Sequence, residues 1–226
     1  MLIDGGNNDQ KENMVQYLQQ YGVKKIDIVI GTHPDADHIG GLSAAIDYAD
    51  VGKIYMPKVQ SNTKTYENLL LSIQKKGLKI TTAKAGLALD LDDELDIQMV
   101  APAQDDLDSN NMSAVIRIQY GQTSFLLTGD ASRESEEAML NTKANLASDI
   151  LLVGHHGSKS STSPDFLKAV NPRYGVIQVG ENSYGHPTET VLKRLQNSQI
   201  QVYRNDTQGT IEFKSDGLNY EIKTER

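Results

Sequence analysis

Two imidazoles and two carboxylates lie between His33 and His38, in the stretch Thr32–Gly41, and these side chains could bind a metal ion. The carboxylates are those of Asp35 and Asp37. Imidazole nitrogen and carboxylate oxygen are donors that Zn²⁺, Mn²⁺ and Fe²⁺ accept. The alternative is a polar turn in which Asp37 caps a helix beginning near His38. A cap explains one or two of these residues and leaves the others unexplained, so the stretch predicts a metal site.

The other three histidines of the chain lie in loops of the same kind, where an apolar run ends beside glycine. They are His155, His156 and His186. A lone histidine is more often a structural residue than a ligand, but five histidines confined to such loops indicate a shared site. Asp130 also follows an apolar run. It could cap a helix starting near Ser132, yet its place at a strand end favours a ligand role.

From the residues alone, the expected ligands are the four side chains of Thr32–Gly41, Asp130 and one of the two adjacent histidines. The spacing does not decide between one metal ion and two. Six or more donors exceed what one four-coordinate ion needs, so two divalent ions are favoured. Two ions sharing a carboxylate lower the pKa of a water between them and stabilise a phosphoryl group during transfer.

Apolar periodicity and turn residues predict the elements that hold these loops. Strands are expected at 26–30, 53–56, 78–82, 87–91, 95–100, 114–118, 124–128, 149–153, 174–179, 200–204, 209–213 and 218–223. Helices are expected over 10–21, 39–48 and 63–76, from near Ser132, from Pro164 and from Pro187. Strands and helices mix in both halves of the chain. This pattern favours an α/β fold with two β-sheets packed face to face and helices outside.

The composition indicates a globular protein and excludes several classes of function. The chain has 226 residues, enough for one large domain or two small ones. It has no cysteine, which excludes disulfides, thiolate metal sites and a cysteine nucleophile. The net charge of −8 argues against a broad electropositive surface for nucleic acid. No apolar run approaches the ~20 residues of a membrane span.

Four segments of the sequence together resemble the motifs of the metallo-β-lactamase superfamily. Thr32–Gly41 resembles the second motif, whose usual form is His-x-His-x-Asp-His. Asp4 resembles the first motif, Leu126–Asp130 resembles the bridging-aspartate motif, and His155–Ser158 resembles the last histidine motif. The resemblance implies a four-layer αββα fold and a dinuclear metal-dependent hydrolase.

A narrower resemblance follows from the variant with Asp35 in place of the second histidine, together with Tyr184–Pro187 and Gln208–Ile211. It is similar to the C-terminal hydrolase-like domain of ComEC-type competence proteins, which are bacterial membrane proteins that import single-stranded DNA. The resemblance implies one metallo-β-lactamase-like domain over residues 1–226, without its first strand and without the membrane part of the parent protein. It also implies a location at the extracytoplasmic face of the cell membrane, with this chain itself soluble.

The resemblance assigns ligands to two metal sites, motif by motif. Site one is expected to contain His33, Asp35, Asp130 and Asn110, and site two Asp37, His38, Asp130 and His156. Asn110 enters because the third-motif histidine of the family is missing and its place falls near this residue. Asparagine is a poorer ligand, able to bind through its carbonyl oxygen or a water. Because oxygen donors replace imidazoles, Mn²⁺ is favoured and Zn²⁺ is possible, with no small organic cofactor.

The resemblance also implies roles in catalysis and substrate binding. Asp37 is expected to orient the attacking water, and His155 and His186 are expected to act next to the metals or on substrate. Substrate contacts are expected from Ser158, Lys159 and Ser113, although Lys159 is about as well explained as a solvated surface lysine.

The favoured function is a phosphodiesterase or nuclease that degrades the DNA strand not imported during uptake. DNA, in single-stranded form, and the membrane channel portion of the parent protein are its expected partners. A second hypothesis is a small-molecule phosphodiesterase or phosphorylcholine-esterase-like hydrolase. The acidic composition fits this hypothesis somewhat better than it fits a DNA-cleaving enzyme. A non-catalytic module of the uptake channel is a third, because the third motif is altered. β-Lactam hydrolysis is least favoured, since Asp35 and Asn110 replace imidazoles.

Overall fold

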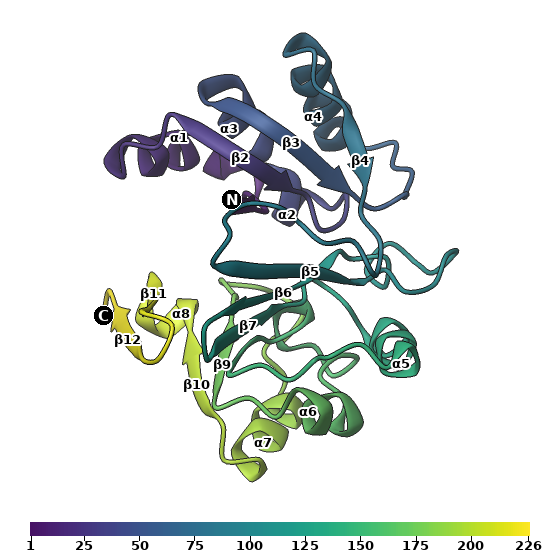
Figure 1. The fold of residues 1–226 in the computed structure, drawn as a ribbon, viewed down its shortest axis with the longest axis vertical. Helices are drawn as coiled ribbons and strands as arrows, with labels where there is room; N and C mark the ends of the chain where they lie inside the picture. The colour runs from purple at the N-terminus through teal and green to yellow at the C-terminus, as the bar shows by residue number, and fades with distance from the viewer. The chain divides into compact units, whose positions relative to one another are not determined.

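The computed structural model describes all residues, 1–226, in two compact units, Met1–Lys84 and Ala85–Arg226 (Figure 1). The elements of the first unit are β1 Leu2–Ile3, a 3₁₀ turn Asn8–Gln10, α1 Lys11–Gln20, β2 Lys25–Ile30, α2 Ala36–Ile39, α3 Leu42–Tyr48, β3 Asp50–Met56, α4 Lys64–Lys75 and β4 Ile80–Thr82. Its four strands form a parallel sheet in the order β1-β2-β3-β4. Because all four run parallel, the loops after β1 and β2 leave the sheet at the same edge.

The core of the first unit lies between this sheet and three helices. Leu18 of α1, Ile46 of α3 and Leu69 of α4 are buried in one cluster with Val29 of β2 and Ile54 of β3. The apolar residues of each helix recur at helical spacing, so one face of each helix is covered by the sheet. This packing leaves the loop after β2 at the sheet edge, outside the core.

The second unit is built on a six-stranded mixed sheet in the order β10-β9-β8-β7-β6-β5. Its elements are β5 Leu95–Ala101, β6 Val115–Tyr120, β7 Thr123–Leu127, α5 Arg133–Thr142, β8 Ile150–Leu152, a 3₁₀ turn His155–Gly157, α6 Pro164–Val170, β9 Tyr174–Ile177, α7 Glu189–Asn197, β10 Gln201–Arg204, α8 Asn205–Gln208, β11 Ile211–Ser215 and β12 Tyr220–Thr224. Strands β5, β6 and β7 pair antiparallel, and β7 to β10 pair parallel. The loops after β7, β8 and β9 therefore open at one edge, which is where ligands bind in open sheets.

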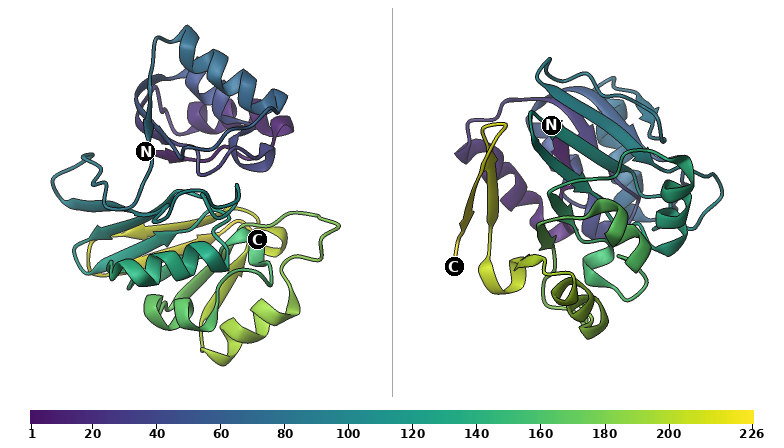
Figure 2. Two further views of the ribbon diagram at one scale, coloured as in Figure 1. Left: turned by 90° about the vertical axis from the view of Figure 1, so that its right-hand side faces the viewer. Right: turned by 60° about the horizontal axis from the view of Figure 1, so that its bottom comes forward.

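The last two strands form a separate antiparallel hairpin, yellow in Figure 2. Aromatic rings connect it to the larger sheet: Phe213 and Tyr220 lie 5.7 Å and 6.1 Å from the ring of Tyr174. The Tyr220 hydroxyl also accepts the backbone N–H of Ser124 at 2.7 Å and donates to Asp149 at 3.0 Å. Burial and the Asp149 carboxylate raise the pKa of Tyr220 to about 12, so this hydroxyl stays protonated and anchors the hairpin.

Most predicted elements are present, and the differences have local causes. The helix expected over 39–48 is split into α2 and α3 at Gly40 and Gly41. A Cβ at Gly40 would lie 2.3 Å from the backbone nitrogen of Asn8, and one at Gly41 would lie 2.2 Å from the carbonyl oxygen of Gly5. The two glycines thus let the segment that follows β1 pass against the start of α3.

Two further expectations need correction, and one short helix was not predicted. The strand expected at 87–91 is a single bridge between Ala88 and Gln98, because turns on both sides leave too few consecutive residues to pair with β5. The helix expected from Pro187 begins at Glu189. A short helix, α8, precedes β11 and was not expected. None of the helices combines the length and the hydropathy that crossing a lipid bilayer requires.

Candidate metal-binding site

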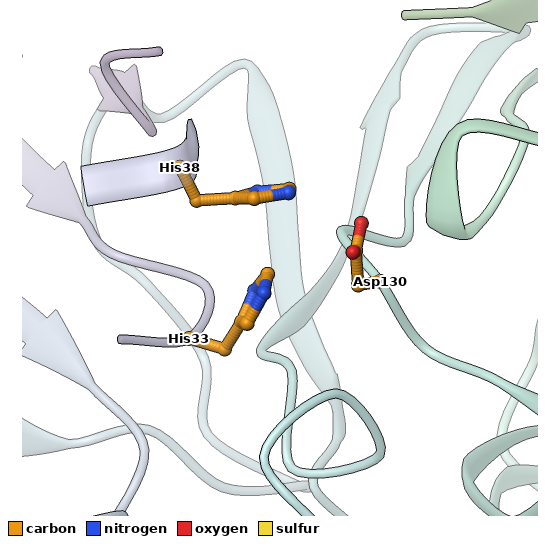
Figure 3. A group of neighbouring side chains, drawn as sticks. All are labelled: His33, His38 and Asp130. Carbon is orange, nitrogen blue, oxygen red and sulfur yellow. The ribbon is translucent and has the colours of Figure 1, made fainter. Parts of the chain in front are cut away.

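The first unit holds one group of donors, in the loop after β2 and in α2. Figure 3 shows His33 and His38 with their rings close together; the ring centroids are 4.2 Å apart and the planes are tilted by 55°. Both side chains are buried. The Asp35 carboxylate lies 3.7 Å from His33 Nε2. Two imidazoles and a carboxylate within one short loop suit a divalent cation.

Asp4 orients His38 and was not predicted as a site residue, although its motif was noted. Its Oδ2 lies 2.8 Å from His38 Nδ1. The same carboxylate accepts the Thr32 backbone N–H at 2.8 Å and the Thr32 hydroxyl at 2.7 Å. With Nδ1–H donating to Asp4, the lone pair of His38 is on Nε2, the nitrogen that can coordinate a cation. A carboxylate early in the sequence, directly after a strand, is the signal that could have identified this role.

The helix-cap interpretation of this stretch is wrong. Helix α2 begins at Ala36, so Asp37 lies inside it and not at its cap. Asp35 is at the N-cap position, but its side chain makes no capping hydrogen bond. Both carboxylates are on the exposed surface of the unit. They are therefore placed where a substrate or a cation from solvent can reach them.

The second unit holds a second group of donors at the edge where β7 and β8 end. Asp130, also shown in Figure 3, follows β7 and is buried. His155 Nε2 lies 3.7 Å from Asp130 Oδ2, and His156 Nε2 lies 3.6 Å from Asp130 Oδ1. The two carboxylate oxygens therefore face one imidazole each.

The backbone at the two adjacent histidines differs from an extended segment. On an extended segment they would point to opposite sides, so that only one could face the metals. In the structure they lie in a tight 3₁₀ turn, and both have positive φ, 49° for His155 and 52° for His156. This left-handed backbone turns both rings toward Asp130.

Their other hydrogen bonds distinguish the two histidines. His156 Nδ1 donates to the carbonyl oxygen of Gln178 at 2.7 Å, which leaves the lone pair on Nε2. His155 Nδ1 lies 3.1 Å from the Ser132 hydroxyl, and its Nε2 lies 3.4 Å from the Asn110 side-chain nitrogen. Asn110 is thus beside His155, with its amide nitrogen directed at the imidazole.

His186 lies next to this second group. Its ring centroid is 5.7 Å from that of His155. Burial lowers the pKa of His186, and the imidazoles of His155 and His156 lower it further. His186 is therefore neutral at pH 7, able to donate one hydrogen bond and to accept another.

The three predicted substrate-binding residues are in different surroundings. Ser113 and Ser158 are buried, and their hydroxyls bond inside the unit: Ser113 Oγ accepts the Asp130 backbone N–H at 3.1 Å, and Ser158 Oγ lies 2.9 Å from Ser160 Oγ. Lys159 is exposed, which agrees both with a substrate contact and with an ordinary solvated surface lysine. The two serines support the loops that carry Asp130 and His155, and their contact with substrate stays a prediction.

One further residue supports Asp130 and was not predicted. Asn111 Oδ1 accepts the backbone N–H groups of Ser132 and Ser135, both at 3.1 Å, and so caps the N-terminus of α5. Asp108 in turn accepts the Asn111 side-chain amide at 2.8 Å. Asp108 and Asn111, both in the acidic run 102–111, therefore help to hold the segment that follows Asp130.

In a comparison with known protein families, a single family model covers both donor groups. The family model described as metallo-beta-lactamase superfamily matches residues 1–181, a range that includes both groups. The chain belongs to the metallo-β-lactamase superfamily. This confirms the superfamily and the fold class expected from the motifs.

Curated relatives of this metallo-β-lactamase superfamily chain include competence proteins. ComE operon protein 3 of Bacillus subtilis (strain 168) is 35% identical over 203 residues, which make up 89% of this chain and 26% of that protein. Competence protein ComA of Neisseria gonorrhoeae is 32% identical over 218 residues, 94% of this chain and 29% of that protein. The chain therefore spans between a quarter and a third of the length of these relatives.

A solved structure supports the fold. The metallo-beta-lactamase fold protein YhfI from Bacillus subtilis aligns with a TM-score of 0.53 and 15% sequence identity, covering 89% of this chain and 81% of that one. At this identity, the likeness concerns the fold alone.

Proposed function

We propose that this chain is a metal-dependent phosphodiesterase that cleaves DNA, with a centre of two divalent ions. The proposed ligands are His33, Asp35, Asp130 and Asn110 for one ion, and Asp37, His38, Asp130 and His156 for the other. The observation that carries the proposal is the orientation of His38 and His156 by Asp4 and the Gln178 carbonyl, which leaves Nε2 of each ring as the donor. The family match supports combining the two groups, because it spans both.

The donor sets fit divalent cations in each unit taken separately. The first unit offers two imidazoles and two surface carboxylates within six consecutive residues, His33–His38. The second offers Asp130 with an imidazole beside each of its oxygens. Nitrogen and oxygen donors of this kind, oriented by a surrounding layer of hydrogen bonds, are typical of catalytic metal sites. When bound, the ions lower the pKa of a water and stabilise negative charge on a phosphoryl group.

The residues around these ligands have roles in the same reaction. Asp37 is exposed at the surface of α2. There its carboxylate can orient the attacking water in line with the phosphorus and accept a proton from that water. His186 is neutral at pH 7, so it can donate a hydrogen bond to a phosphate oxygen without adding charge. His155 is placed between Ser132 and Asn110, which fix its ring beside Asp130.

The biological setting is also part of this proposal. Because its relatives are named as competence proteins, we assign the activity to DNA uptake, with degradation of the strand that is not imported. The chain would act at the extracytoplasmic face of the cell membrane, next to the channel portion of a longer parent protein. Single-stranded DNA is its proposed substrate.

One observation favours a second candidate. The net charge of −8 suits a small anionic substrate neutralised by bound cations better than a long polyanion. The second candidate is therefore a small-molecule phosphodiesterase on the same site. A non-catalytic module is the outcome if no phosphodiester is cleaved.

The test is hydrolysis by chelator-stripped protein reloaded with Mn²⁺, Zn²⁺ or Mg²⁺, using labelled single-stranded DNA, double-stranded DNA and bis-p-nitrophenyl phosphate. Asp37→Ala should lower turnover at least about a hundredfold. The fold should survive, because Asp37 is exposed and outside the core. The matched control is Asp93→Ala, which removes an exposed turn carboxylate of the second unit. Metal-loaded, folded protein that cleaves none of the three substrates would overturn the proposal.

A further inference from the structure

The loop between β9 and α7 is an ordered arm that carries an exposed aromatic residue. It projects as a long yellow-green loop in the left view of Figure 2. Asn182 holds the loop in shape: its side-chain nitrogen donates to the carbonyl oxygens of Gly180 and His186, both at 2.9 Å. Its side-chain oxygen accepts the His186 backbone N–H at 3.0 Å. Three hydrogen bonds from one side chain fix the backbone of this loop on both sides of Tyr184.

Tyr184 is the most exposed large apolar side chain of the chain, with 82% of its surface accessible. Its ring is 6.0 Å from that of His186, with an angle of 33° between the planes. His186 in turn lies 5.7 Å from His155, which faces Asp130. A continuous path of rings therefore leads from the donor group of the second unit to an exposed tyrosine.

We propose that Tyr184 is a stacking platform for a base of single-stranded DNA, next to the phosphate that is cleaved. The ring lies next to His186, and because it is exposed it offers a flat apolar surface to a base. Stacking of bases on aromatic side chains is the common mode of sequence-tolerant single-strand binding. The inference rests on the proposed function, since it assigns the substrate of that same site.

The charge of the chain gives a second reason for a stacking residue. Proteins that hold DNA through phosphates use many lysines and arginines, but here acidic residues outnumber basic ones, 30 to 22. With DNA as the proposed substrate, contacts other than a broad basic surface then supply part of the affinity for a strand. Stacking supplies such affinity and selects against duplex DNA, whose bases already stack on each other and do not expose their faces.

The first experiment compares Tyr184→Ala and Tyr184→Phe in the metal-loaded 226-residue chain. Tyr184→Ala should raise KM for a single-stranded oligonucleotide about 5- to 100-fold, because one base loses its stacking partner. The increase in KM that Tyr184→Ala causes for bis-p-nitrophenyl phosphate should be at least about fivefold smaller. Tyr184→Phe keeps the ring, so its KM should equal that of the unmodified 226-residue chain. The control is Tyr21→Ala, which removes another exposed and ring-stacked tyrosine, 61% accessible, at the end of α1, and should change neither substrate.

The second experiment moves an abasic position along the oligonucleotide. In the parent chain, one abasic position should reproduce the KM increase of Tyr184→Ala. In Tyr184→Ala, that position should have no further effect. Equal KM values for Tyr184→Ala and the parent chain, or equal losses on DNA and on bis-p-nitrophenyl phosphate, would overturn the inference.

A third measurement separates this inference from the proposed activity. A 2-aminopurine base in single-stranded DNA loses fluorescence when it stacks, so binding can be followed in chelator with no turnover. The parent chain and Tyr184→Phe should quench the probe, and Tyr184→Ala should not. Quenching without hydrolysis under any metal would overturn the phosphodiesterase and retain the platform. Hydrolysis together with equal quenching by all three proteins would retain the phosphodiesterase and overturn the platform.

Discussion

At the scale of single residues, hydrogen bonds on the far side of each imidazole decide which nitrogen can bind a cation. Asp4 accepts from His38 Nδ1, and the Gln178 carbonyl accepts from His156 Nδ1. His155 differs, because its Nδ1 has only a hydroxyl partner, Ser132, and its Nε2 faces an amide nitrogen. The same residue type therefore has different roles at neighbouring positions.

The role of Asp4 predicts the effect of Asp4→Asn. Loss of the negative charge behind His38 should weaken metal binding about 10- to 100-fold, as is typical when such a partner is removed. Asparagine tolerates the positive φ of this position, 57°, and its oxygen can still accept from Thr32, so the fold should be unaffected. Competition with a chelating dye measures the affinity, with Asp93→Asn as the control. Unchanged affinity would show that Asp4 serves the fold and not the ligand.

The two adjacent histidines give a second prediction. His156→Ala should lower the bound metal, because it removes an oriented Nε2 donor. His155→Ala should keep most of the metal and mainly lower activity, because the Asn110 amide already occupies its Nε2. Metal analysis of both variants after dialysis decides between them, with circular dichroism to confirm folding. Equal loss of metal in both would mean that the two imidazoles, which both face Asp130, are both ligands.

At the scale of elements, the polar side chains that stabilise the site loops come from neighbouring helices. Glu136 of α5 is buried and accepts the backbone N–H groups of Thr162 and Ser163, the latter at 2.8 Å. Arg194 of α7 donates to the carbonyl oxygens of Ser161 and Thr162. The segment between the His155–Gly157 turn and α6 is thus held from two helices at once.

Glu136 predicts a pH dependence of stability. Burial raises the pKa of Glu136 above its ordinary value of 4.5, although its hydrogen bonds and Arg194 oppose the shift. The folded chain then holds this proton more tightly than the unfolded chain, so ionisation of Glu136 opposes folding. Its contribution is most favourable below pH 4.5 and declines as pH rises from there through the raised pKa.

The comparison that isolates this contribution is urea unfolding of the parent chain and of Glu136→Gln between pH 4 and pH 7, with chelator present. Glutamine does not ionise, so the unfolding free energy of the parent chain minus that of the variant should fall as pH rises. The histidines titrate in both proteins and cancel in the difference. A difference that rises with pH would mean that the ionised carboxylate is stabilised in the fold.

At the scale of the whole molecule, the chain has a metallo-β-lactamase fold, and its proposed donor set is rich in oxygen. Among the proposed ligands, Asp35 takes the place of a histidine of the usual motif, and Asn110 is assigned to the place of another. Carboxylate and carbonyl oxygens suit Mn²⁺ and Mg²⁺, whereas imidazoles suit Zn²⁺. Zinc still outranks manganese in raw affinity, so binding strength alone does not identify the working metal.

This donor set predicts metal preference. Removal of metal with chelator should abolish turnover, and Mn²⁺ should restore the highest activity, with Zn²⁺ bound but less active. The double variant Asp35→His with Asn110→His should move the preference toward zinc. Turnover of stripped protein titrated with each metal tests both statements. Highest turnover with Zn²⁺ in the parent chain would show that these two positions do not determine the metal.

Most strands, most helices and the loops that carry the donors could be predicted from the sequence alone. Apolar runs such as Ile26–Ile30 and Ile150–Val153 predicted strands because burial on a sheet requires β-branched and apolar residues at those positions. The donors after them were evident because ligand chemistry depends on residue type. The motifs also identified the superfamily, since their order and spacing are local properties of the chain.

Which groups orient the candidate ligands became evident from the tertiary structure. Asp4 meets His38, 34 residues away, because β1 and β2 pair in parallel, and Gln178 meets His156, 22 residues away, because β8 and β9 do. The positive φ of His155 and His156 likewise cannot be deduced from residue type, since residues other than glycine adopt that region only rarely. Residue type and spacing determine local preferences, whereas partners distant in sequence and strained backbone angles depend on how the whole sheet is assembled.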